Sequence, residues 1–300
     1  MKDLQEYIKH PKIDAHNHLN LGMHYRSYLA WSGTPIPDFP RKMAGLDDMH
    51  DIISRYTRPR CQTPRDVISL LGMSIDDAIA DGVTILEGSI DISFMVHFSE
   101  DIDKFCEMVS SYVDMYRGRI DFRPELGIGK TFDKEKTARW APELIQSGVF
   151  RSIDLYGPEI EEGIEDFHSI FELAVKRGLK KKAHVGEFSN AASVRRFVEL
   201  FDLDEVQHGI GAAQDDAVLR FLADRKVRCN VCPQSNVMLG AVPDLKSHPV
   251  KKMLDAGVPV SIGTDDLLFF DQSVSTQIFN LVSERVITPA DAETLLSTGI

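Results

Sequence analysis

Two histidines, His16 and His18, stand two residues apart in the apolar run 12–19. Side chains two apart on a strand point to the same side, so both imidazoles can reach one cation. His184 and Asp265 also stand at the ends of apolar runs, and they would add a third neutral nitrogen and one carboxylate. These four ligands suit zinc, or another borderline divalent metal, with one position left open for water. We therefore predict one zinc ion per chain.

Three further polar residues near the predicted ligands could take part in catalysis, two of them by moving protons. Hydrolytic attack by water activated on a metal needs one group to accept the water proton and another to protonate the electrophile or the leaving group. Glu187, three residues after His184, and His208 are the candidates for these two tasks. Asp266 adjoins a predicted ligand but points in a different direction, which leaves it free to hydrogen-bond a substrate nitrogen or to orient His208.

These residues need a scaffold that brings distant segments together. Short apolar runs typical of buried parallel strands alternate with segments of helical periodicity. The eight runs are 12–19, 83–91, 120–128, 149–157, 179–186, 205–211, 227–233 and 258–264. Eight strands, each followed by a helix, predict an α/β fold of the (β/α)8 or TIM-barrel type. The active site of such a barrel lies at the carboxyl ends of the strands, where the candidate histidines and aspartates stand.

One spacing in this pattern is far longer than the others, because residues 20–82 separate the first two strands. The first half of this insertion is rich in aromatic residues, proline and glycine, which suits an irregular loop or short helices over a pocket. We predict that the insertion after the first strand includes a lid whose aromatic residues shape what fits; an ordinary peripheral excursion is the alternative. These aromatic residues are Tyr25, Tyr28, Trp31 and Phe39. With no linker-like segment, residues 1–300 are predicted to form a single metal-dependent hydrolase domain.

Composition excludes several partners. The chain has 46 acidic and 34 basic residues and a formal charge of −12, the wrong sign for binding phosphate backbones, so nucleic acid is excluded. The short run 180–182 of three lysines is predicted to be solvated surface. No stretch approaches the roughly 20 apolar residues that cross a bilayer, and residues 1–12 lack the apolar segment of a signal peptide. Four cysteines are too few for a disulfide framework, which agrees with a reducing compartment. From these observations together we expect a cytoplasmic protein without a membrane partner.

Five segments in order, DAHNHL, IDLYGPE, KAHVGE, VQHGIG and SIGTDD, resemble the adenosine deaminase branch of the amidohydrolase superfamily. The segment CPQSNVMLG, followed by HPVKKMLDAGVPVSIGTDD, fits the same family, and the resemblance covers nearly the whole chain. It implies a zinc-dependent hydrolase that releases ammonia from C6 of a 6-aminopurine nucleoside. Adenosine or a related small purine would be the substrate, and adenine or another amino-heterocycle is the alternative.

The resemblance also implies a role for each site residue, beginning with the four ligands that would hold the zinc. Glu187 would protonate the purine ring at N1, and His208 would orient and deprotonate the attacking water. Asp266 would accept a hydrogen bond from N7, and the backbone of Gly157 would donate one to N3. Asp154 matches a family carboxylate in the fourth strand and is expected to give structural support.

One departure from the family concerns the sugar. The family usually follows its two histidines with Leu-Asp-Gly, whose aspartate helps to bind the ribose 5′-hydroxyl, whereas this chain has Leu19, Asn20 and Leu21. Asn20 can still hydrogen-bond a hydroxyl but carries no charge, and charge-assisted hydrogen bonds are about twice as strong as neutral ones. We therefore predict that Asn20 holds the ribose end more weakly or differently.

Two other classes of function are open. The first is a metal-dependent amidase or phosphoesterase on the same barrel. Many such relatives bridge two metals with a modified lysine at the end of the fourth strand, but the stretch SIDLYGPE contains no lysine. The second is a binding protein without turnover, against which the retention of Glu187 and His208 argues.

Overall fold

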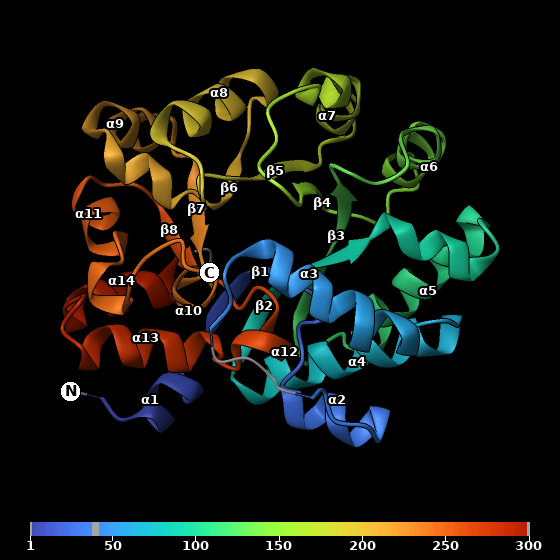
Figure 1. The fold of residues 1–300 in the computed structure, drawn as a ribbon, viewed down its shortest axis with the longest axis horizontal. Coiled ribbons are helices and arrows are strands. Elements are labelled where there is room, and N and C mark those ends of the chain that lie inside the picture. Colours follow the sequence, from blue (N-terminus) through green and yellow to red (C-terminus); the bar gives the residue numbers. More distant parts are fainter. Residues whose placement is uncertain (1, 38–41, 299–300) are drawn as a thin grey trace.

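A barrel of eight parallel strands forms the centre of the molecule in the computed structural model, which describes residues 2–37 and 42–298 (Figure 1). Each strand pairs with the next one along the chain, and a parallel bridge from Asn17 to Asp265 brings the last strand back to the first. The strands are β1 (Lys12–His18), β2 (Val83–Asp91), β3 (Asp121–Gly129), β4 (Ser152–Tyr156), β5 (Lys180–Val185), β6 (Glu205–His208), β7 (Arg228–Val231) and β8 (Val260–Ile262). The predicted TIM barrel is confirmed, with most of the strands shorter than predicted.

Helices surround the barrel as a ring (Figure 1). Their apolar faces pack against the outward side chains of the strands and form the core. They include α1 (Leu4–Lys9), α4 (Pro64–Ala80), α5 (Ile102–Met115), α6 (Lys134–Gln146), α7 (His168–Arg177), α8 (Ala191–Phe201), α9 (Asp216–Arg225), α11 (Val250–Asp255), α13 (Val274–Ser283) and α14 (Pro289–Ser297). Short 3-10 segments precede or follow some of these helices: η3 (Ile92–Phe98), η4 (Ile164–Phe167), η5 (Ile210–Gln214) and η6 (Leu245–Ser247).

Helix α4 shows how the sequence fixes these elements. Thr63 accepts a hydrogen bond from the backbone N–H of Asp66, and the Asp66 carboxylate accepts one from Thr63, which together form a capping box. Pro64 occupies the first turn, where its missing N–H costs nothing. Val67, Leu71 and other apolar residues at helical spacing then turn one face of the helix toward the core.

The long insertion 20–82 contains helices before α4. They are α2 (Tyr25–Ser32), α3 (Leu46–Ile52), the π-helical turn η1 (Ile53–Thr57) and the 3-10 turn η2 (Arg58–Arg60). Tyr28 is buried, and its ring lies 5.8 Å from that of Trp31 between centroids. Phe39, the last of the predicted lid aromatics, lies outside the described residues. Two short helices follow the last two strands: α10 (Pro233–Met238) comes after β7, and α12 (Leu267–Phe270) comes after β8.

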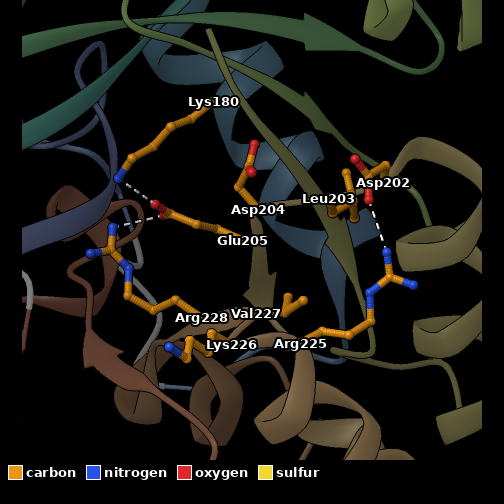
Figure 2. Close-up of a pocket in the computed structure, with 9 residues that line it drawn as sticks. All are labelled: Lys180, Asp202, Leu203, Asp204, Glu205, Arg225, Lys226, Val227 and Arg228. Carbon is orange, nitrogen blue, oxygen red and sulfur yellow. Dashed lines mark hydrogen bonds and ion pairs between the residues drawn. The ribbon is translucent and has the colours of Figure 1, made fainter. Parts of the chain in front are cut away.

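The lysine run 180–182 was predicted to be solvated surface, and this is wrong for two of its three residues, because only Lys180 is exposed. The run begins β5, and Lys181 and Lys182 are buried there, with Lys182 wholly inaccessible. The ammonium of Lys182 lies 2.7 Å from a Glu87 carboxylate oxygen and 2.8 Å from one of Glu125. Figure 2 shows the edge of this cluster, where Lys180 and Arg228 both pair with Glu205.

The Lys182 cluster leads to a prediction about stability. Replacing Lys182 by methionine would remove the cation that pairs with buried Glu125 and one of the cations that pair with buried Glu87, which is expected to lower the free energy of unfolding by about 3–5 kcal/mol. Lys180→Met is the matched control, because the Lys180 side chain is 46% exposed although it contacts two of the same glutamates. Its cost should be about 1 kcal/mol or less. Chemical unfolding followed by circular dichroism measures both, and equal losses would contradict the prediction.

Candidate active site

A cavity of 720 Å³ opens at the carboxyl ends of the strands. The insertion reaches it, since Leu46, Met49 and Ile53 from α3 and η1 line the cavity, and Figure 1 shows α3 crossing in front of β1 and β2. Eight of the nine predicted site residues also line it: His18, Asn20, Gly157, His184, Glu187, His208, Asp265 and Asp266. The ninth, His16, is buried beneath them.

The four predicted metal ligands converge in the structure. His16 Nε2 and His18 Nε2 each lie 3.6 Å from Asp265 Oδ1, and His18 Nε2 lies 3.3 Å from His184 Nε2. Tetrahedral ligands bound at about 2.0–2.2 Å from a zinc ion are separated by about these distances. The four side chains come from β1, the end of β5 and the residues after β8, so only the closed barrel brings them together.

Hydrogen bonds on the far side of two histidines aim them at a cation. His16 Nδ1 lies 3.3 Å from the Asn230 carbonyl and His184 Nδ1 lies 3.2 Å from Asp154 Oδ1, so both Nδ1 atoms carry the hydrogen. The Nε2 lone pairs are then directed toward the site, an arrangement common among metal-bound histidines. His16 Nε2 is buried and has no hydrogen-bond partner in residues 2–37 and 42–298. Asp154, expected only to give structural support, orients a predicted ligand.

Electrostatics also fit a metal site. Burial lowers the pKa of His16 to about 4 and moves the pKa values of His18 and His184 downward, so all three are neutral near pH 7. Neutral imidazole is the form that binds metal. Ser235 donates a 2.6 Å hydrogen bond to Asp265 Oδ2, which leaves Oδ1 facing the histidines. The convergence, the unpartnered His16 nitrogen and the three-nitrogen, one-oxygen donor set together fit zinc.

The two proton-handling candidates lie beside this cluster. His208 Nε2 is 3.5 Å from Glu187 Oε2 and 3.9 Å from Asp265 Oδ2. Burial raises the pKa of Glu187 well above its ordinary value, and the Asp265 and Glu159 carboxylates add to this rise, which favours the protonated carboxyl. His208 and Asp265 both have left-handed backbone, with φ of 63° and 58°, a conformation that concentrates at functional sites when glycine is absent.

Sequence reasoning missed the residue that holds the Glu187 loop. The Glu159 carboxylate accepts hydrogen bonds from the backbone N–H groups of Glu187 at 2.6 Å, Phe188 at 3.2 Å and Ser189 at 2.5 Å. Glu159 closes the segment IDLYGPE, and Ser235 stands in CPQSNVMLG, so both lie in segments that were already singled out for their likeness to a family.

The predicted substrate-binding residues lie at the cavity wall. Gly157 has a φ of 100°, a conformation that a side chain would strain. Asn20 is half-buried, and Asp266 is buried with its Oδ1 unpartnered among the described residues. Burial, together with neighbouring Asp265, raises the pKa of Asp266 well above its ordinary value.

An eight-stranded parallel barrel that gathers three histidines and an aspartate at its strand ends defines a metal-dependent hydrolase of the amidohydrolase type. A sequence model of the family described as adenosine deaminase matches residues 41–293. The chain belongs to the adenosine deaminase family, as its resemblance implied.

One relative is similar in sequence, and solved structures are similar in fold. A Treponema pallidum protein with the provisional name adenosine/adenine deaminase is 58% identical over 297 residues, which are 99% of each chain. The crystal structure of adenine deaminase from Arthrobacter aurescens superposes with a TM-score of 0.83 at 20% identity, covering 97% of this chain and 92% of that one. An amidohydrolase from Burkholderia ambifaria, solved with bound zinc, gives a TM-score of 0.82 at 22% identity over 98% and 85% of the two chains.

Family membership confirms that the protein is a metal-dependent aminohydrolase, and with the donor set it confirms zinc as the cofactor. No helix in the described part of the chain is both long and apolar enough to cross a bilayer.

Proposed function

We propose that the protein hydrolytically deaminates a 6-aminopurine nucleoside, adenosine or a related compound. The observation that carries this proposal is the placement of Glu187 and His208 beside the histidine–aspartate cluster, at the floor of a 720 Å³ cavity. Such a volume lies within the range of about 300–1,000 Å³ typical of small-ligand sites. A protein that only held a metal would need neither group.

In the proposed reaction, water adds at C6 of the purine and the amino group leaves as ammonia. His16, His18, His184 and Asp265 would hold zinc, which when bound lowers the pKa of a water molecule toward about 7. Glu187 gives its proton to N1, which makes C6 more electrophilic. His208 hydrogen-bonds and orients the attacking water. One proton of that water restores the Glu187 carboxyl, which gave its own proton to N1, and the other passes to the amino group, which leaves as ammonia.

Two substrate contacts complete the proposal. The Gly157 N–H donates to N3 of the purine. The family resemblance led to the prediction that Asp266 accepts a hydrogen bond from N7. N7 of a nucleoside carries no hydrogen, so Asp266 cannot accept a hydrogen bond from it. A protonated Asp266 carboxyl would donate to N7 instead, and the raised pKa of Asp266 favours that form.

Adenine or another amino-heterocycle is the second candidate substrate. The observation that favours it is the uncharged Asn20 at the cavity wall, where the family's usual aspartate would bind a ribose hydroxyl. We also propose that α2, α3 and η1 act as a lid within one barrel domain of residues 1–300, and that the protein works in the cytoplasm.

A panel of substrates tests the proposed function. Ammonia release and absorbance change would be measured with adenosine, deoxyadenosine, 5′-modified adenosines, adenine and other amino-heterocycles, each with and without a chelator. We expect deamination that the chelator abolishes and added zinc restores. Turnover of adenine alone would favour the second candidate, and no deamination of any compound by the zinc-loaded protein would overturn the proposal.

The sugar prediction concerns Asn20. If this neutral amide holds the ribose weakly, removal of the 5′-hydroxyl should lower kcat/KM by less than about tenfold, which is 1.4 kcal/mol. Asn20→Asp should then increase the preference for adenosine over 5′-deoxyadenosine, because a carboxylate forms the stronger hydrogen bond. If removing the 5′-hydroxyl lowers the wild-type kcat/KM by more than about tenfold, and Asn20→Ala abolishes this difference, then Asn20 already binds the hydroxyl and the prediction is wrong.

A further inference from the structure

A chain of hydrogen bonds lies behind Glu187 and His208, on the side away from the cavity. It runs from the backbone of Val250 through His248 to Asn236 in α10. Asn236 is wholly buried and His248 is 3% exposed. Neither residue lines the cavity or belongs to the predicted metal cluster.

The direction of this chain is fixed at its outer end. A backbone N–H can only donate, so the 3.2 Å contact from Val250 N makes His248 Nδ1 an acceptor. Burial lowers the pKa of His248 to about 3, so the ring is neutral and its hydrogen must sit on Nε2. His248 Nε2 lies 3.2 Å from Asn236 Oδ1 and therefore donates to it.

The oriented amide of Asn236 then acts on both proton-handling residues. Its nitrogen has two hydrogens and two partners, Glu187 Oε1 at 3.1 Å and His208 Nδ1 at 3.2 Å. His208 Nδ1 must accept, so neutral His208 carries its hydrogen on Nε2. That atom faces Glu187 Oε2 and Asp265 Oδ2, on the side of the metal cluster.

We propose that Asn236 and His248 are positioning residues that set the tautomer of His208 and hold the carboxyl of Glu187. His208 therefore meets the attacking water as a hydrogen-bond donor. This differs from the proton-accepting role that the family resemblance implies for His208. The kinetic consequence rests on the proposed deaminase function, but the tautomer does not.

The tautomer can be measured directly on the zinc-loaded wild type. Histidine-selective ¹⁵N NMR, with His208 signals assigned by comparison with His208→Asn, should show a protonated Nε2 and a bare Nδ1. The reverse pattern would overturn the proposal without reference to any substrate. If this pattern is found but no purine is deaminated, the proposed function fails while the positioning assignment stands.

Variants test the consequence for turnover. Asn236→Asp keeps the shape but replaces the donor with an acceptor, so the His208 hydrogen should move to Nδ1 and kcat should fall by about 10²-fold, with KM changed much less. His248→Leu removes the donor to Asn236 and should also lower kcat, whereas His248→Gln supplies an amide donor and should recover much of the loss. Zinc content and Tm identify any misfolded variant. Wild-type kcat in folded Asn236→Asp, or equal losses in His248→Leu and His248→Gln, would overturn the proposal.

Discussion

Replacing Glu187 by glutamine is expected to lower kcat by at least about a hundredfold, the usual contribution of one acid or base group. Glutamine matches glutamate in size and can keep the neighbouring contacts, but it has no acidic proton to deliver to N1. Burial raises the pKa of the Glu187 carboxyl and so favours the form that carries such a proton. Zinc content and Tm should stay close to the wild-type values, since Glu187 is not among the four proposed ligands.

The neighbouring Phe188 supplies a matched control for this experiment. Its side chain is 44% exposed, and Phe188→Ala leaves its backbone N–H free to bond Glu159 as before. Phe188→Ala should deaminate the substrate at the wild-type rate when single-turnover and steady-state kinetics are measured for both variants. Normal turnover of zinc-loaded Glu187→Gln would show that a different residue supplies the proton.

His184→Ala is expected to remove zinc and abolish deamination. It deletes one of three nitrogens whose positions match a tetrahedral site and leaves the 3.3 Å His18 contact without its partner. His168→Ala is the matched control, because that histidine lies on α7 with its side chain 50% exposed. Metal analysis after dialysis, with ammonia release on zinc re-addition, measures the effect.

A milder variant tests how the site is oriented. Asp154→Asn should weaken zinc binding by about 10–100-fold, the usual effect of losing a group that orients a metal-bound histidine. Full zinc occupancy in His184→Ala, or two zinc ions in the wild type, would contradict the single four-ligand site.

The sequence by itself determined the barrel and the residues that meet at its mouth. Strands leave a local signal, since apolar runs at regular spacing follow from the burial of both faces of each strand. The alternation of strand side chains placed His16 and His18 on one side, and the position of His184 at the end of its run placed it at the same rim. These inferences need only local patterns and the rule that parallel strands end together.

The tertiary structure alone decided how the site residues are oriented and which charges are buried. The local sequence predicts that Lys182 is one of three exposed lysines. In the structure, its side chain is buried in the barrel and pairs with Glu87 and Glu125, which come from other strands. Likewise, nothing local to Asn236 shows that it bonds both Glu187 and His208. Hydrogen bonds and ion pairs between segments remote in sequence form only when the distance between their atoms is right to within a few tenths of an ångström. Only the closed, packed barrel fixes those distances.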